Sequence, residues 1–237
     1  MNSIDRQVNR SPGFSALDKF WLAPWGLYDL TIFGIPLIAA VIGLLVAGKP
    51  WCWLALVPLV LLIWLISFFR NPPRKIPDDP RAIVGPADGT VVDITPLAHY
   101  DFIGGPAVRI GIFLSIFNVH INRSPLAGRV IELHYHPGEF LNALRPESAE
   151  RNEFMWIGFE QAESPSHRFA VRQISGMLAR RIVCTLEAGQ TVTRGEKFGM
   201  IKLGSRTELI LPAETVEVTV NIGDRIHAGA DTIARWK

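Results

Sequence analysis

Two long apolar runs dominate the hydrophobic pattern near the start of this chain. Residues 30–47 and 51–69 carry no charged side chain, and only Gly48, Lys49 and Pro50 separate them. As helices, the runs would be about 27 and 29 Å long, close to the hydrocarbon thickness of a bilayer. Because so short a break permits only a tight reversal, the pattern predicts a helical membrane hairpin with both ends on one side.

Basic residues flank the two ends of this hairpin, whereas Lys49 stands alone at its tip. The flanking basic residues are Arg6, Arg10, Lys19, Arg70, Arg74 and Lys75. The positive-inside rule therefore places both ends of the hairpin, and the chain that follows, on the cytoplasmic side of the cell (inner) membrane. Tryptophans lie where interfacial anchors are expected, at Trp21, Trp25, Trp51 and Trp53.

Other interpretations of the apolar runs remain open. Buried core helices are disfavoured, because two long uncharged runs follow one another directly. Pro36 and Pro58 can each kink a helix, which leaves room for a re-entrant hairpin that never crosses the bilayer. A cleaved signal peptide is disfavoured, because the polar leader is long and no small-residue cleavage site follows a short apolar core.

From residue 82 onward the apolar positions form short runs, separated by glycine and proline, that are typical of strands. The clearest runs are residues 90–94, 108–114, 130–133, 169–174 and 216–220. Two pairs of segments show weak internal sequence similarity, which we call the first and second internal echo. Residues 85–91 resemble 211–216, and residues 189–195 resemble 223–229, each pair sharing a pattern of turn residues. This cadence is typical of biotinyl/lipoyl-like flattened barrels. We therefore expect a mainly β domain, rolled into a flattened barrel or sandwich, after the α-helical membrane hairpin.

These patterns divide the chain into four segments. Residues 1–29 are a polar N-terminal leader, 30–69 the two-helix membrane hairpin, 70–81 a proline-rich basic linker and 82–237 the β-rich domain. The prolines and charges of the linker are typical of a stiff, extended segment, and its basic side chains would attract anionic lipid headgroups.

Composition narrows the classes of function. The formal net charge is only +2 over 237 residues, which argues against a nucleic-acid-binding face. Cys52 and Cys184 lie in unlike contexts, so no disulfide framework is predicted. His134 and His136 share one face of a predicted strand, but no cluster of further ligands accompanies them, so we expect no metal site.

A hydroxyl follows a glycine inside the apolar run at Leu203, Gly204 and Ser205. If a base is nearby, the Ser205 hydroxyl can attack the preceding carbonyl and turn the amide into an ester. Glycine leaves the approach to that carbonyl open. β-Elimination and hydrolysis with loss of ammonia would then leave a pyruvoyl group on the new N-terminus.

This motif, a Pro86-Ala87-Asp88-Gly89 turn, the Asn118-Val119-His120 segment and the apolar hairpin together resemble phosphatidylserine decarboxylases of the short bacterial type. The resemblance covers most of the chain from the linker onward. It implies that the chain cuts itself between Gly204 and Ser205. It also implies that His120 is the processing base and that Asp88 holds the imidazole, as in a Ser-His-Asp arrangement.

The resemblance further implies pyruvoyl-dependent decarboxylation of phosphatidylserine to phosphatidylethanolamine in phospholipid biosynthesis. The ketone derived from Ser205 would form a Schiff base with the substrate amine, and carbon dioxide would then leave. The partners would be phosphatidylserine and the anionic membrane, not nucleic acid. The mature protein would be a heterodimer of chains 1–204 and 205–237. Assembly of such heterodimers into a higher oligomer is compatible with this prediction.

Three more residues are candidates for substrate binding. His136 lies in a segment, residues 135–140, that resembles a family segment, and Arg151 and Asn152 lie in the family's Arg-Asn-Glu signature. A guanidinium at residue 151 can pair with a phosphate or a carboxylate, although a surface ion pair explains it equally well. The family motif at the cleavage site continues with threonine, where this chain has Arg206.

Two alternative functions remain. A decarboxylase of a related serine-headgroup ether lipid would use the same residues. A membrane-tethered lipoyl-like adaptor would have no chemistry, with Lys202 as its carrier lysine, but the chain lacks the Met-Lys-Met-type hairpin tip of such carriers.

Overall fold

The computed structural model describes residues 21–237, except 142, 144–146, 162–165, 178–180 and 203. Most of the expected polar leader, and Leu203 of the cleavage motif, therefore lie outside the described residues. The chain divides into two compact units, with the boundary between Pro72 and Pro73.

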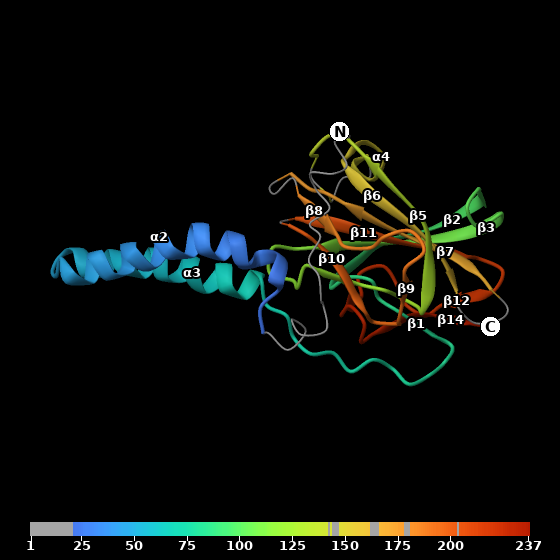
Figure 1. Cartoon of the computed structure of the whole chain (residues 1–237), viewed down its shortest axis with the longest axis horizontal. Coiled ribbons are helices and arrows are strands. Elements are labelled where there is room, and N and C mark those ends of the chain that lie inside the picture. The colour runs from blue at the N-terminus through green and yellow to red at the C-terminus, as the bar shows by residue number, and fades with distance from the viewer. Residues whose placement is uncertain (1–20, 142, 144–146, 162–165, 178–180, 203) are drawn as a thin grey trace. The chain divides into compact units, whose positions relative to one another are not determined.

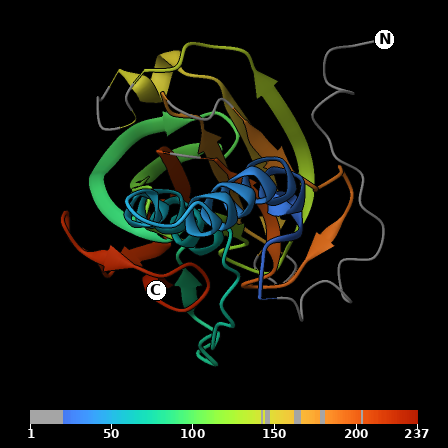
Figure 2. The same cartoon turned by 90° about the vertical axis from the view of Figure 1, so that its left-hand side faces the viewer.

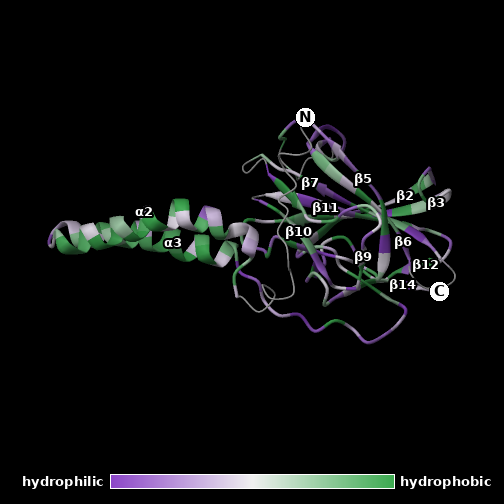
Figure 3. Ribbon diagram, in the orientation of Figure 1, coloured by the Kyte–Doolittle hydropathy of each residue, from purple (hydrophilic) through white to green (hydrophobic). Residues whose placement is uncertain are grey.

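The first unit is an apolar helical hairpin. Its helices are α2 (Leu27–Val46) and α3 (Leu56–Phe68), and two 3-10 turns, η2 (Pro24–Gly26) and η3 (Trp51–Ala55), precede them. Hydrophobic residues cover both helices along their length (Figure 3). Pro36 lies inside α2, whereas Pro58 lies in the first turn of α3, where a missing backbone N–H breaks no intrahelical hydrogen bond.

Backbone hydrogen bonds close the base of the hairpin. The Ala23 N–H donates to the Phe69 carbonyl and the Asn71 N–H to the Trp21 carbonyl, each at 2.7 Å. Both helical segments, 24–46 and 51–68, are long and apolar enough to cross a bilayer, and only 6% and 22% of them are buried. This exposure favours a lipid environment over a protein core, because apolar helices in water would be covered.

The second unit is built around a curled, fully antiparallel sheet of eight strands (Figures 1 and 2). In spatial order, the strands are β13 (Arg225–Ile226), β2 (Gly89–Tyr100), β3 (Gly105–Leu114), β11 (Ser205–Pro212), β7 (Arg168–Ile174), β6 (Phe154–Gln161), β5 (Gly128–His136) and β9 (Thr191–Val192). β11 therefore lies in the middle of the sheet, between β3 and β7.

Two three-stranded sheets complete this unit. One contains β1 (Ala82–Val84), β14 (Thr232–Trp236) and β12 (Val216–Val218), and the other β4 (Ile121–Arg123), β10 (Lys197–Ile201) and β8 (Ile182–Cys184). A short helix, α4 (Ser148–Arg151), leads into β6. The expected fold class, a mainly β domain with a curled sheet after an apolar helical hairpin, is confirmed.

The two faces of the large sheet carry different side chains. The inner face packs with the small sheets into the main core, to which Ile112, Val171 and Leu209 belong. The outer face carries a smaller apolar cluster around Trp156 and Ile210. Because side chains alternate along a strand, each strand contributes to both layers, and neighbours in the sequence face opposite ways.

The glycines of the second internal echo form turns, as the sequence predicts. The φ angles of Gly189, Gly195, Gly223 and Gly229 are 86°, 79°, 98° and 74°. Residues with a Cβ rarely adopt this left-handed region, so the echo reflects a shared turn geometry.

Candidate active site

Ser205 is the first residue of β11, where it pairs with Leu114 at the end of β3. Its side chain is fully buried, and its Oγ has no hydrogen-bond partner. The preceding Gly204 has a φ of 65°, and no atom lies within 4 Å of the position that a Cβ would take. The chain therefore enters the strand through a glycine-specific conformation with open space beside the Gly204–Ser205 bond.

His120 lies directly before β4, next to the chain that leads to Ser205. Its carbonyl accepts a hydrogen bond from the Ile201 N–H at 3.3 Å. The imidazole is fully buried, and its Nδ1 lies 3.0 Å from the Asn118 carbonyl oxygen. Because a carbonyl can only accept, Nδ1 carries the hydrogen and Nε2 is the basic nitrogen.

A buried amide links the strand of His120 with the strand of Ser205. Asn122 donates from Nδ2 to Thr207 Oγ1 at 3.1 Å, and Gln173 donates from Nε2 to Asn122 Oδ1 at 2.9 Å. Ser205 and Thr207 are two residues apart in β11, so they share a face of that strand. The bond between Asn122 and Thr207 therefore holds β4, the strand directly after His120, against the face of β11 that carries Ser205. Asn122 and Gln173 were not predicted from the sequence, although the two-residue spacing from His120 is a signal for Asn122.

Asp88 is buried in the turn before β2, where both of its oxygens are bonded. Oδ2 lies 2.6 Å from Arg74 Nη2, and Oδ1 accepts the Ala228 N–H at 2.8 Å. Burial raises the pKa of Asp88 above its usual value, while Arg74 and the Ala228 N–H oppose that rise. The carboxylate is thus held between a cation and a backbone donor.

The turn of Asp88 lies beside the strand that follows His120. The Pro86 carbonyl accepts the Arg123 N–H at 3.0 Å and Asn122 Nδ2 at 3.3 Å. The family resemblance predicts that Asp88 orients the imidazole of His120. In the structure, the Asn118 carbonyl makes a bond of that kind to His120 Nδ1, while Asp88 bonds to Arg74 and Ala228.

Arg206, which replaces the family threonine, points to the other face of β11. Its guanidinium is buried and bonds to Asp93 and Glu208, with Nε 3.0 Å from Glu208 Oε1. Glu208 also accepts from Arg172 at 2.7 Å. A Cβ on Gly111 would overlap both Asp93 and Arg206, so the missing side chain makes room for their ion pair.

The three expected substrate-binding residues lie in different environments. His136 stacks on Phe154 on the outer face, with ring centroids 4.8 Å apart. Arg151 is an exposed surface residue, paired with Glu139 at 2.6 Å. Asn152 is fully buried, and its side chain bonds to the Leu141 N–H and to the Leu141 and Ser175 carbonyls. The structure therefore does not bring these three side chains together.

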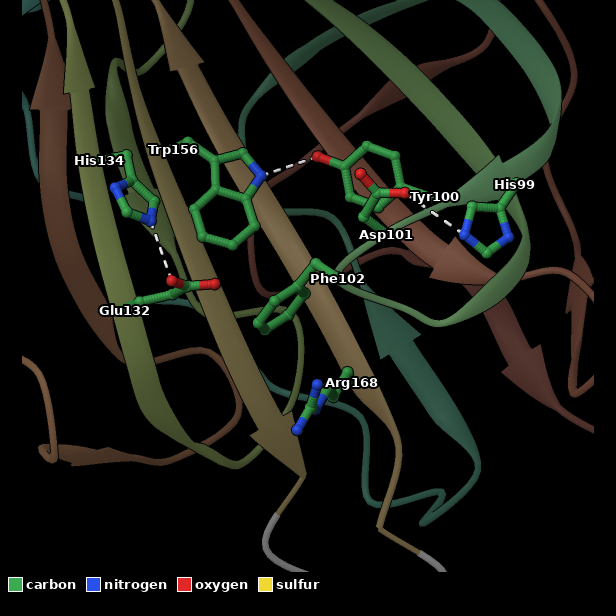
Figure 4. A pocket seen from close by; sticks show the side chains of 8 residues that line it. All are labelled: His99, Tyr100, Asp101, Phe102, Glu132, His134, Trp156 and Arg168. Carbon is green, nitrogen blue, oxygen red and sulfur yellow. Dashed lines mark hydrogen bonds and ion pairs between the residues drawn. The ribbon is translucent and has the colours of Figure 1, made fainter.

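A cavity of about 620 Å³ opens on the outer face of the sheet (Figure 4). Its lining residues are His99, Tyr100, Asp101, Phe102, Glu132, His134, Trp156 and Arg168. Trp156 donates from Nε1 to the Tyr100 hydroxyl at 2.8 Å, and His134 lies 2.9 Å from Glu132. Because Ser205 faces inward, this cavity is separated from the serine by the sheet. In the part of the chain that the structure describes, no group of three metal-ligating side chains is found.

Comparisons with known proteins identify the class. The family model described as phosphatidylserine decarboxylase matches residues 61–234. Proteins named phosphatidylserine decarboxylase proenzyme are similar over most of the chain. The one from Rhodopirellula baltica is 47% identical over 90% of this chain and 87% of its own length. Those from Carboxydothermus hydrogenoformans and Chlorobium limicola are 45% and 44% identical, over 78% and 87% of this chain and 85% and 100% of their own lengths.

A β-rich domain that holds a buried serine after a glycine and a buried histidine thus matches the family model of a lipid decarboxylase. The chain belongs to the phosphatidylserine decarboxylase family, and its activity is the decarboxylation of phosphatidylserine. The alternative of an adaptor without chemistry is wrong. Lys202, its expected carrier lysine, is only 5% exposed, whereas a carrier lysine must reach solvent.

Proposed function

We propose that this chain is a proenzyme that cuts itself between Gly204 and Ser205 and turns Ser205 into a pyruvoyl group. The matured protein converts phosphatidylserine to phosphatidylethanolamine in phospholipid biosynthesis. One observation carries the proposal: the Ser205 Oγ is buried without a partner, on the strand face to which Asn122 links the strand of His120. The name proenzyme, which the similar proteins carry, supports a processed chain.

The first step needs only groups of the chain itself. His120 Nε2 takes the proton of the Ser205 hydroxyl, and Oγ bonds to the Gly204 carbonyl carbon. The carbon–nitrogen bond then breaks, and the proton passes to the Ser205 nitrogen. Gly204 becomes an ester of the serine side chain, with no net change in charge.

Elimination and hydrolysis complete the maturation. Loss of the Ser205 α-proton breaks the bond between Cβ and Oγ and releases Gly204 as a carboxylate. Water then replaces the nitrogen, which leaves as ammonia, so a ketone remains on the new N-terminus. This pyruvoyl group would accept the electron pair that remains on the substrate when carbon dioxide leaves.

Asp88 completes the site from the neighbouring turn. Its oxygens each keep a second lone pair beyond the bonds to Arg74 and Ala228. A carboxylate beside this site favours the positive charge that His120 gains when it accepts the serine proton. We therefore assign Asp88 an electrostatic role in maturation.

The two products of cleavage stay together in this fold. The short chain, 205–237, begins in the middle of the large sheet, where β11 pairs with β3 over its whole length and with β7 over residues 206–210. The mature protein is thus a heterodimer of chains 1–204 and 205–237. The helical hairpin holds it on the cytoplasmic side of the cell membrane, where its substrate and anionic lipids lie.

Intact-mass measurement of the purified protein tests the proposal. We expect two chains, with the mass of the shorter one equal to residues 205–237 carrying a ketone in place of the serine amine and hydroxyl. Ser205→Ala should remain a single chain, whereas the exposed control Ser166→Ala should split as the wild type does. A wild-type protein that decarboxylates phosphatidylserine while its Gly204–Ser205 bond is intact would overturn the proposal.

A further inference from the structure

A row of buried polar side chains extends from Ser205 across the inner face of the large sheet. Ile174 pairs with Arg206 on one side and with Phe154 on the other. One position along, the same registers place Ser175 between Ser205 and Glu153. The Ser175 N–H donates to the Glu153 carbonyl at 2.9 Å, which extends the pairing of β6 and β7 to this row. Residues directly opposite in a sheet share a face, so all three side chains point inward.

The side chains of this row end in atoms without partners. Ser205 Oγ, Ser175 Oγ and Glu153 Oε2 are each buried and accept or donate no hydrogen bond. Ser205 and Ser175 are fully buried, and Glu153 is 2% exposed. Buried polar atoms are nearly always satisfied, because an unmade hydrogen bond destabilises the folded state. Three of them in one row indicate a place where a polar ligand completes the bonding.

The carboxylate of Glu153 is held with one oxygen bonded and the other open. Its Oε1 accepts from the Tyr135 hydroxyl at 2.7 Å. Burial, together with Glu153 itself, raises the pKa of Tyr135 to about 12, so the hydroxyl keeps its proton and remains the donor. Asn152 fixes the preceding residue, with bonds to the Leu141 and Ser175 backbones. The direction of the open Oε2 is therefore set by its surroundings.

Three basic side chains, Arg151, Arg172 and Arg206, are bonded to other carboxylates. Arg151 pairs with Glu139 at the surface, and Arg172 and Arg206 lie with Glu208 on the outer face. Among the described residues, none forms an ion pair with Glu153. A buried carboxylate calls for a cation, and the phosphatidylserine headgroup carries one in its ammonium group.

We propose that Glu153 binds the ammonium group of the substrate's serine headgroup. This inference rests on the proposed function, since it places that group beside the atom that Ser205 becomes. The backbones of β11 and β6 are two strand spacings apart, about 10 Å, and Ser175, whose side chain is small, lies between them. Its hydroxyl, which has no partner, is a donor for the headgroup's oxygens.

The test compares binding of two lipids to matured protein. Short-chain phosphatidylethanolamine carries the ammonium group but has no carboxylate to lose, and short-chain phosphatidylglycerol has neither. Both are titrated calorimetrically into the wild type, Glu153→Gln and the control Glu160→Gln. Glu160 lies on the same strand, but it pairs with Arg168 at the surface. Intact mass is measured first for each protein, so that cleavage and binding are judged separately.

We expect Glu153→Gln to weaken phosphatidylethanolamine binding about tenfold or more, because a charge-assisted bond is lost, and to leave phosphatidylglycerol binding unchanged. Glu160→Gln should bind both lipids as the wild type does. If Glu153→Gln weakened the binding of both lipids equally, Glu153 would have a structural role only. If it changed the binding of neither lipid, Glu153 would have no role in binding. Either result overturns the subsite while cleaved wild type still supports the proposed function. Uncleaved, active wild type overturns the proposed function instead.

A second variant covers the case in which Glu153→Gln does not fold. Tyr135→Phe removes only the hydroxyl that holds Oε1 and keeps the charge of Glu153. We expect it to lower the preference for phosphatidylethanolamine over phosphatidylglycerol about threefold or more, since one hydrogen bond orients the carboxylate. An unchanged preference in this variant would overturn the proposal.

Discussion

Ser205 and Arg206 are consecutive residues, yet their side chains lie on opposite faces of β11. The Ser205 hydroxyl faces the main core without a partner, while the Arg206 guanidinium bonds to Asp93 and Glu208 in the outer layer. The departure from the family threonine therefore leaves the serine side of the strand unaltered. It also ties Arg206 to β2 and β7 through an ionic cluster, because Arg206 pairs with Asp93 of β2, and Glu208, its partner on β11, pairs with Arg172 of β7.

The first prediction concerns the space that Gly111 leaves for this cluster. Gly111→Ala should lower the free energy of unfolding by about 1–3 kcal/mol, because the new methyl group overlaps the ion pair of Asp93 and Arg206. Chemical denaturation measures the change. Gly105→Ala is the control, since no atom lies within 4 Å of its added Cβ.

The same substitution in an Arg206→Thr background should cost less, because the shorter side chain vacates the space. A double-mutant cycle measures this coupling. Equal costs in both backgrounds would mean that the guanidinium is not what fills the space above Gly111.

His120→Gln should slow self-cleavage by about 100-fold or more, because in the proposed mechanism His120 Nε2 takes the serine proton. The measurement is the time course of chain splitting after rapid refolding or cell-free synthesis, followed by gel or mass. The control is His134→Gln, a histidine exposed on the outer face. A variant without His120 that splits at the wild-type rate would remove this residue from the mechanism.

Self-cleavage should weaken in acid at a pH above the ordinary range of an aspartate. Burial raises the pKa of Asp88, so the carboxyl group is protonated earlier as the pH falls, and it then loses its charge beside the site. Asp88→Asn should cleave slowly at every pH, and the ratio of the wild-type rate to its rate should fall as the Asp88 carboxyl group is protonated. The cleavage rates of both proteins are measured from pH 4 to 8. Parallel pH profiles would contradict the electrostatic role of Asp88.

The raised pKa of Asp88 also makes the free energy of unfolding depend on pH. A carboxyl group whose pKa in the folded state lies above its usual value of 3.8 binds protons more tightly in the folded than in the unfolded state. Its contribution is fully present below that value and is lost as the pH rises through the folded pKa. Over this window, the wild type should therefore lose stability relative to Asp88→Asn, which denaturation at several pH values checks.

Two exposed apolar side chains lie beyond the strand ends next to Ser205. Phe117 follows β3 and is 71% exposed, and Met177 follows β7 and is 55% exposed. Phe117→Ser with Met177→Ser should lower activity on phosphatidylserine vesicles several-fold, because apolar contacts with the bilayer are lost, and leave activity on short-chain substrate unchanged. Ile222→Ser, at 65% exposure, is the control. Equal losses on both substrates would contradict membrane contact by these two residues.

Local patterns in the sequence were enough to predict the hairpin and the strands. Uncharged runs and alternating apolar positions are properties of neighbouring residues, so they appear without knowledge of the fold. The proposed chemistry at Gly204 and Ser205 is equally local, because the hydroxyl and the carbonyl that it involves belong to adjacent residues.

The rest of the site depends on register between distant strands. Glu153 joins the row of Ser205 only because two strand pairings align at Ile174, and Gly111 meets Arg206 only across β3 and β11. The bond of Asp88 to Ala228 likewise spans 140 positions of the chain. No spacing in the sequence encodes such contacts, so the partner of Asp88 and the burial of Arg206 could not be predicted.

The central position of β11 determines the order of folding and the proposed cleavage. Without this strand, β3 and β7 would each expose an unpaired edge, and such edges invite pairing with other polypeptides. Synthesis and folding must therefore come before the proposed cut, because the chain that begins at Ser205 contributes the strand that joins the two halves of the sheet.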